Sequence, residues 1–126
     1  VNPDSSIERC DLTRIQSFAI DDVRTTAVDD AIGMEDGEIW VHIADPGAGV
    51  APGDEADEEA LVRGESLHIP EGVIHMLPHA ILERYSLGFQ ATSQALSFRL
   101  TPAEDGSVEL SEVVPSIVSI KRMSYA

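Results

Sequence analysis

The residues of this chain best able to do chemistry are two aspartate pairs, Asp21-Asp22 and Asp29-Asp30, in the stretch FAIDDVRTTAVDDA at 18–31. Carboxylates at this density repel one another unless water, a cation or a partner separates them. Because a loop of this length can fold back, it can bring Asp29 and Asp30 close to Asp21. Hard cations such as Mg²⁺ take oxygen ligands, and bound metal ions can activate water for phosphodiester cleavage. The stretch fits such a metal site, although a solvated acidic loop is the commoner origin of this pattern.

The histidines give weaker indications of chemistry. His75 and His79 have the i, i+4 spacing of helical zinc ligands, but Pro78 lies between them and the sequence contains no HExxH motif. His42 alternates with Trp40 in a strand-like run, which indicates a structural role. No serine lies in a nucleophile-elbow motif, and no glycine-rich stretch has the GK[ST] ending of a phosphate loop. The aspartates remain the best candidates.

Length and composition limit the class of protein. The 126 residues are enough for one domain with a modest core, and 43% hydrophobic and 25% charged residues are typical of a soluble globular protein. The sequence contains neither an apolar run near the roughly 18 residues of a membrane span nor a secretory leader. Cys10 is the only cysteine, which excludes an internal disulfide and favours the cytoplasm. The chain begins at Val1, and we expect it to be a piece of a longer protein.

The charge is strongly acidic, with 23 acidic against 8 basic residues and a formal net charge of −15. Taken alone, this argues against a protein that binds a phosphate backbone, because such surfaces are normally basic. The charge suits a cation site, a basic partner, or a fragment whose basic half lies elsewhere.

Local patterns predict the elements that must position the aspartates. The block DEADEEA at 54–60 predicts a helix over 54–63, with Asp54 as N-cap, acids in the first turn and Gly64 as the C-terminal stop. We expect its carboxylates to form a solvent-exposed face of the helix. A second short helix is expected to begin near Pro78.

The rest of the chain reads as strands joined by tight turns, including SFAID and SLHIP. Asp36-Gly37 predicts a type I′ hairpin turn, and we expect the same device at Asp105-Gly106. Pro115 suggests a sheet edge or a bulge. The pattern predicts an α+β fold with a mixed or antiparallel sheet, hairpins and short helices.

Several motifs follow one another along the chain: ERCDLTRIQSFAIDD with VDDAIG, then WVHIADPGAGVAPGDEADEEALVRGESLHIPEGVIHMLP, then YSLGFQATSQALSFRLTPAEDGSV. Together they resemble the beginning of the RNB catalytic domain of the ribonuclease II and ribonuclease R family of 3′→5′ exoribonucleases. The resemblance implies that residues 11–126 form the N-terminal portion of a truncated RNB-like domain, preceded by a lead-in segment at 1–10.

The resemblance also implies roles for individual residues. Asp21 matches the strand-end aspartate of the family, and Asp29 and Asp30 match its closing pair; in the family these acids bind Mg²⁺, with Mn²⁺ as an alternative. Asp29 takes the position most closely tied to cleavage. His68 takes the place of an aromatic residue that stacks on a base near the RNA 3′ end, and an imidazole stacks more weakly than a tyrosine ring. Arg63 matches an arginine of the family and is expected to contact RNA.

One departure from the family pattern leaves alternatives open. A further aspartate of the motif falls here on Ala27, whose methyl group cannot bind a cation, and Asp22 is an extra acid nearby. The resemblance implies single-stranded RNA as substrate, with the remainder of the RNB domain and OB-type RNA-binding domains outside this segment. The first alternative is a degenerate RNB protein that binds RNA or a protein partner without cleavage. The second is an acidic interaction module that recruits basic proteins.

Overall fold

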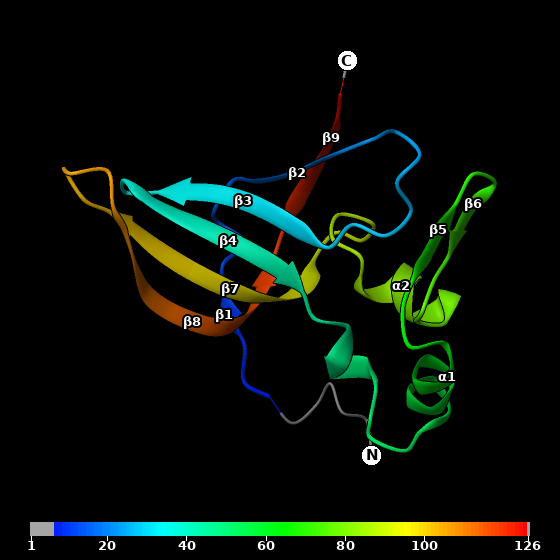
Figure 1. Cartoon of the computed structure of the whole chain (residues 1–126). Helices are drawn as coiled ribbons and strands as arrows, with labels where there is room; N and C mark the ends of the chain where they lie inside the picture. Colours follow the sequence, from blue (N-terminus) through cyan, green and yellow to red (C-terminus); the bar gives the residue numbers. More distant parts are fainter. Residues whose placement is uncertain (1–6, 126) are drawn as a thin grey trace.

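The computed structural model describes residues 7–125 (Figure 1). Nine strands, two helices and a 3₁₀ turn at Pro46–Gly49 follow one another within this range. The strands are β1 (Cys10–Asp11), β2 (Ser17–Asp21), β3 (Asp30–Glu35), β4 (Glu38–Ala44), β5 (Leu67–Ile69), β6 (Gly72–Ile74), β7 (Ser93–Pro102), β8 (Val108–Val118) and β9 (Ile120–Ser124), and the helices are α1 (Glu55–Arg63) and α2 (His79–Tyr85). Most of the expected lead-in segment at 1–10 lies outside the described residues.

Seven of the strands form one mixed sheet in the order β1-β8-β7-β4-β3-β2-β9, while β5 and β6 pair only with each other. The pairs β1–β8 and β2–β9 are parallel, and the other pairs are antiparallel. Strand β8 lies next to one edge of the sheet and β9 forms the other edge, yet only Ser119 separates them in the chain. The two edges must therefore come close together, and the sheet curls strongly (Figure 1). The β5–β6 hairpin, α1 and α2 lie together to one side of it. The predicted α+β fold with a mixed sheet is confirmed.

The concave side of the sheet holds both an apolar core and a chain of polar contacts. The apolar residues include Leu12, Ala19, Val28, Trp40, Leu87, Ala95 and Val118. His42 is fully buried among them, with Nε2 at 3.0 Å from the Ser17 hydroxyl and Nδ1 at 2.7 Å from the Ser97 hydroxyl. The Ser97 hydroxyl in turn lies 2.6 Å from that of Ser116. The predicted structural role of His42 fits these contacts, because a buried imidazole needs partners for both ring nitrogens.

The two predicted hairpins form, but their turns differ. Asp36 and Gly37 have φ values of 53° and 78°, as a type I′ turn requires. At the second hairpin only Gly106 has a positive φ, of 85°, and its N–H donates to the carbonyl of Ala103. This geometry is a longer loop with glycine at the left-handed position, so the expectation of a second type I′ turn is wrong. The Asp105 carboxylate accepts from the Ser107 N–H at 2.9 Å and stabilises the longer loop instead.

Helix α1 follows its sequence signals closely. The Asp54 carboxylate accepts hydrogen bonds from the N–H groups of Asp57 and Ala51, both at 2.8 Å, and these bonds lower the pKa of Asp54. Gly64 ends the helix with a φ of 74° and donates to the Ala60 carbonyl. The predicted helix boundaries and cap are therefore confirmed.

Three further elements complete the comparison with the predictions. Helix α2 begins directly after Pro78, as expected, and β5 corresponds to the strand-like SLHIP. Strand β6 was not predicted, because three residues carry no usable periodicity. Pro115 lies in β8 just before β1 begins to pair at Ser116, so it sits at a sheet edge, while the bulge of this hairpin falls between Arg99 and Leu100. Neither helix of the described range is long and apolar enough to cross a membrane.

Candidate active site

A cavity of about 800 Å³ separates the loop between β2 and β3 from the β5–β6 hairpin. Figure 1 shows the loop, drawn in blue, on the side of the sheet where the hairpin lies. One wall is formed by residues of the loop, namely Asp22, Arg24, Thr25, Thr26, Ala27 and Asp29. The opposite wall comes from the hairpin and the segment after it, and includes His68, Val73, His75 and Met76. The fold thus brings Asp29 and His68, two residues singled out from the sequence, to one cavity.

The backbone around Asp29 is fixed by contacts with the core. Val28 is fully buried, and its carbonyl accepts a 3.0 Å hydrogen bond from the Leu87 N–H. The Asp29 carbonyl accepts from the Ala44 N–H at 2.8 Å. Asp30 then begins β3 and pairs with β4. The backbone is therefore held to the sheet and core at Asp29, which lines the cavity.

The carboxylates of Asp21, Asp29 and Asp30, which we call the aspartate cluster, interact electrostatically. Partial burial raises the pKa of Asp29, the negative charges of Asp30 and Asp21 raise it further, and His75 acts in the opposite direction. Like charges at short range disfavour ionisation, and a bound cation relieves that repulsion. Carboxylate oxygens are the type of ligand that a hard divalent cation such as Mg²⁺ prefers.

The side chains of the aspartate cluster are not arranged as a complete metal site. Within residues 7–125, no three acids, histidines or cysteines are grouped so that they could hold a metal ion. Asp22, the extra acid, accepts from the side chain of Arg24 at 3.1 Å, and its pKa is lowered by that contact. The metal site at Asp21, Asp29 and Asp30 therefore remains a prediction, and Asp22 is engaged elsewhere.

The two residues expected to contact RNA lie in different places. His68 is exposed on β5 and lines the cavity that Asp29 also lines. Arg63 ends α1, where it pairs with Glu59 and donates to the His75 carbonyl at 2.9 Å. Arg63 does not line the cavity and instead ties α1 to the segment that follows the hairpin.

Two residues of the site were not singled out by the sequence patterns. The Thr26 hydroxyl lies 3.4 Å from His75 Nε2, so that the loop and the hairpin segment touch beside Asp29. His75 was considered only as a zinc ligand paired with His79, but His75 precedes α2 and His79 begins it. The contact joins residues far apart in the sequence, and only a signal linking positions 26 and 75 could have revealed it.

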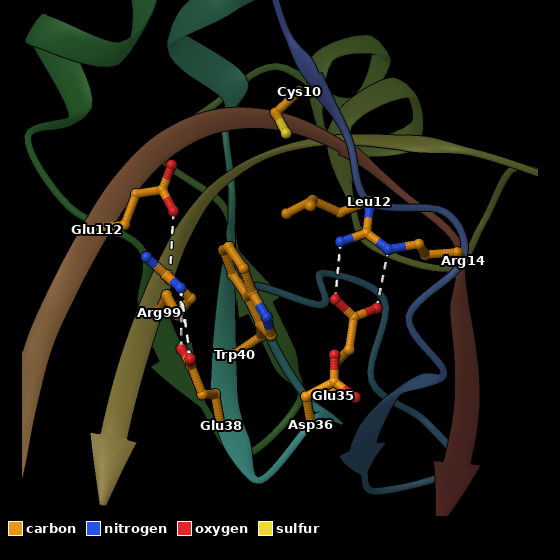
Figure 2. Close-up of a pocket in the computed structure, with 9 residues that line it drawn as sticks. All are labelled: Cys10, Leu12, Arg14, Glu35, Asp36, Glu38, Trp40, Arg99 and Glu112. Carbon is orange, nitrogen blue, oxygen red and sulfur yellow. Dashed lines mark hydrogen bonds and ion pairs between the residues drawn. The ribbon is translucent and has the colours of Figure 1, made fainter.

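A second, smaller cavity of about 220 Å³ lies beside Trp40 (Figure 2). Arg14 forms a two-point ion pair with Glu35, at 2.7 and 2.8 Å. Figure 2 shows Arg99 between Glu38 and Glu112, and both ion pairs measure 3.2 Å. Because these charged groups are committed to one another, the smaller cavity is a weaker candidate for catalysis.

Comparisons with known proteins show the family to which the chain belongs. The family model of the RNB domain matches residues 9–126. A protein of Synechocystis sp. described as an uncharacterized ribonuclease is 39% identical over 130 residues, covering 98% of this chain and 20% of that protein. Mycoplasma genitalium RNase R, solved in complex with ribose methylated single-stranded RNA, superimposes with a TM-score of 0.82. It is 26% identical, and the match covers 93% of this chain and 19% of that chain.

A third match carries a different description. Yeast Ssd1, described as a pseudonuclease, superimposes with a TM-score of 0.81 at 21% identity, over 92% of this chain and 15% of that chain. At this identity the match shows a shared fold alone. In all three comparisons the chain spans a fifth or less of the length of the protein it matches.

Proposed function

Since the chain belongs to the RNB domain family, we propose that it is the N-terminal portion of the catalytic domain of a 3′→5′ exoribonuclease that hydrolyses single-stranded RNA. The observation that carries the proposal is the shared cavity of Asp29 and His68. A carboxylate for chemistry and a ring for stacking on a base then face the same bound nucleotide. RNA-binding proteins use exposed rings in this way to hold single-stranded RNA.

Each residue of the cluster receives a role in this proposal. Asp21, Asp29 and Asp30 would hold Mg²⁺ or Mn²⁺, which when bound supplies a Lewis acid for phosphodiester hydrolysis. Asp29 is the catalytic residue in this proposal. Its backbone is hydrogen-bonded to the core, and the charges of Asp30 and Asp21 raise the pKa of its carboxyl group. His68 orients the 3′-terminal nucleotide by stacking, and Val73 and Met76 add apolar side chains to the same wall.

Other parts of the parent protein complete the RNA path. With a net charge of −15, the chain needs a basic surface from elsewhere to attract a phosphate backbone, and we assign that surface to OB-type domains outside it. The outer side of the sheet exposes Ile32 and Met34, at 46% and 66%, as expected of a surface that meets the remainder of the domain. We place the protein in the cytoplasm, in line with its single cysteine.

The second candidate function is RNA binding without cleavage. It is favoured by Ala27, which lines the cavity but offers no oxygen ligand at a position where the family motif has an aspartate. The likeness of fold to a protein described as a pseudonuclease is compatible with it. An acidic interaction module is a third candidate, carried by the exposed acids of α1.

The test is RNA decay by the full-length protein, measured over a titration of Mg²⁺ and of Mn²⁺. We expect 3′→5′ degradation of single-stranded RNA to mononucleotides, dependent on the cation. Asp29→Asn should stop cleavage and leave RNA binding largely intact, because it removes a charge at the reacting centre rather than along the RNA path. Glu58→Gln is the matched control, since Glu58 is exposed on α1 and its loss should leave the rate unchanged.

The outcomes separate the candidates. Absence of decay at every cation concentration in the wild type, with RNA binding retained, would establish the binder instead of the enzyme. Decay that persists at the wild-type rate in Asp29→Asn would remove Asp29 from the catalytic role.

A further inference from the structure

The loop that carries Asp29 touches the hairpin segment at one polar contact, between Thr26 Oγ1 and His75 Nε2 at 3.4 Å. Within the described part of the chain, this is the only hydrogen bond that joins residues 22–29 to residues 65–77. The contact is long and partly open to solvent, so it contributes little to global stability. Its position matters more, because Thr26 and His75 both line the cavity that Asp29 also lines.

The backbone of His75 is held so that its ring has a defined place. Its carbonyl accepts a 2.9 Å hydrogen bond from Arg63 Nη1, at the end of α1. The next residue, Met76, donates its N–H to the Ser66 hydroxyl at 2.9 Å, just before β5. Two anchors on neighbouring elements therefore fix the segment from which the imidazole projects toward Thr26.

Thr26 lies three residues before Asp29 in the same loop, and Ala27, the next residue, has no hydrogen-bonding side chain. Thr26 therefore supplies the contact with the hairpin segment.

We propose that His75 is a positioning residue of this site. Through Thr26 it holds the loop of residues 22–29 against the β5–β6 hairpin, so that Asp29 and His68 face the same RNA nucleotide. The role is positioning rather than metal binding, because no three ligand-type residues of the described range are grouped around one point. The inference rests on the proposed function, since it concerns the same cavity and the same RNA.

The experiment uses the full-length protein with single-stranded RNA and saturating Mg²⁺, and measures kcat, KM and RNA affinity separately. His75→Ala should lower kcat between about 10-fold and 100-fold, as expected when a catalytic group is misplaced by a fraction of an ångström to an ångström. RNA affinity, measured without the cation, should stay within about twofold, because stacking on His68 is retained. His75→Gln keeps a hydrogen-bonding group near the Nε2 position and should restore most of kcat.

Two further variants test the partner and the specificity of the effect. Thr26→Val removes the hydroxyl and should lower kcat as His75→Ala does, and the double variant should be no slower than either single one, within about twofold. His79→Ala is the matched control: it makes the same change at an exposed histidine four positions further, outside the cavity. Its kcat should equal that of the wild type.

Hydrogen exchange of residues 22–29 gives a readout independent of activity, and we expect faster exchange in His75→Ala than in wild type. If the wild type degrades RNA and His75→Ala keeps its kcat, or His75→Gln fails to restore it, only the inference is overturned. If the wild type degrades no RNA, the proposed function fails. The positioning contact is then judged by exchange alone, and equal exchange in both proteins overturns it.

Discussion

The backbone carbonyl of Asp29 accepts a 2.8 Å hydrogen bond from the N–H of Ala44, the last residue of β4. This bond ties the loop between β2 and β3 to a central strand of the sheet at the residue that we propose as catalytic. Together with buried Val28, it anchors the backbone of Asp29 to the sheet, while the contact between Thr26 and His75 joins the loop to the hairpin segment.

The variant Ala27→Asp tests whether an added carboxylate beside Asp29 strengthens cation binding. Ala27 lies two residues before Asp29 on the same cavity wall, so a carboxylate at that position would share the cavity with Asp29. We expect a lower Mg²⁺ concentration for half-maximal RNA decay, or a higher kcat, because an added oxygen donor strengthens a site for a hard cation. The measurement is a cation titration of RNA decay beside wild type. A variant that needs more Mg²⁺ than wild type would show that the cluster has no room for a further carboxylate.

His68→Tyr should tighten RNA binding, and His68→Ala should weaken it. Stacking of a base on an aromatic side chain contributes about 1–3 kcal/mol per base, and a phenol ring offers a larger face than an imidazole. His68 is exposed, so neither change should affect folding. Affinity for single-stranded RNA without the cation is the measurement. Equal affinities for all three proteins would mean that no base stacks at this position.

His42 should make the folded chain less stable as the pH falls. Burial lowers the pKa of His42 from 6.5 to about 4, so in the folded state the ring stays neutral while in the unfolded state it takes up a proton. Stability is therefore retained above pH 6.5 and decreases between about pH 6.5 and pH 4, by up to about 3 kcal/mol. Urea unfolding of the chain over this pH range measures the effect, and the imidazole signal of His42 in NMR should not titrate above about pH 5.

The control for this pH effect is His42→Gln. The variant should be less stable at every pH, because the hydroxyls of Ser17 and Ser97 lose an optimal partner. Its stability should also vary less between pH 6.5 and pH 4. An unchanged pH dependence would assign the effect to other groups.

Gly33→Ala should destabilise the chain by about 1–3 kcal/mol, the usual range for an overpacked core position. A methyl group at Gly33 would collide with the Ser17 hydroxyl, which is bonded to His42, and would lie 2.9 Å from Ile15 Cγ2. Gly47→Ala is the matched control, since its methyl would meet only Asp45 Oδ1 at 3.6 Å. Thermal unfolding of both variants provides the comparison, and equal melting temperatures would contradict the predicted clash.

The elements with local signals could be predicted from the sequence. Asp54 and Gly64 define α1 because a cap and a left-handed stop are set by residues within one turn of the helix ends. Asp36-Gly37 defines a hairpin for the same reason, since the turn type depends on two φ angles. The α+β class and the resemblance to the RNB family also follow from local motifs in a fixed order.

Tertiary structure decided what local motifs leave open. At Asp105-Gly106 the same dipeptide adopts a different turn, because the flanking strands and the Ser107 contact select a longer loop. The bond from Arg63 to the His75 carbonyl could not be foreseen either, and the contact of Arg63 with RNA stays a prediction. The approach of Thr26 to His75, like the shared cavity of Asp29 and His68, requires the sheet to curl and the hairpin to dock beside the loop. Contacts of this kind depend on the packing of distant segments, which no periodicity or turn residue in either segment encodes.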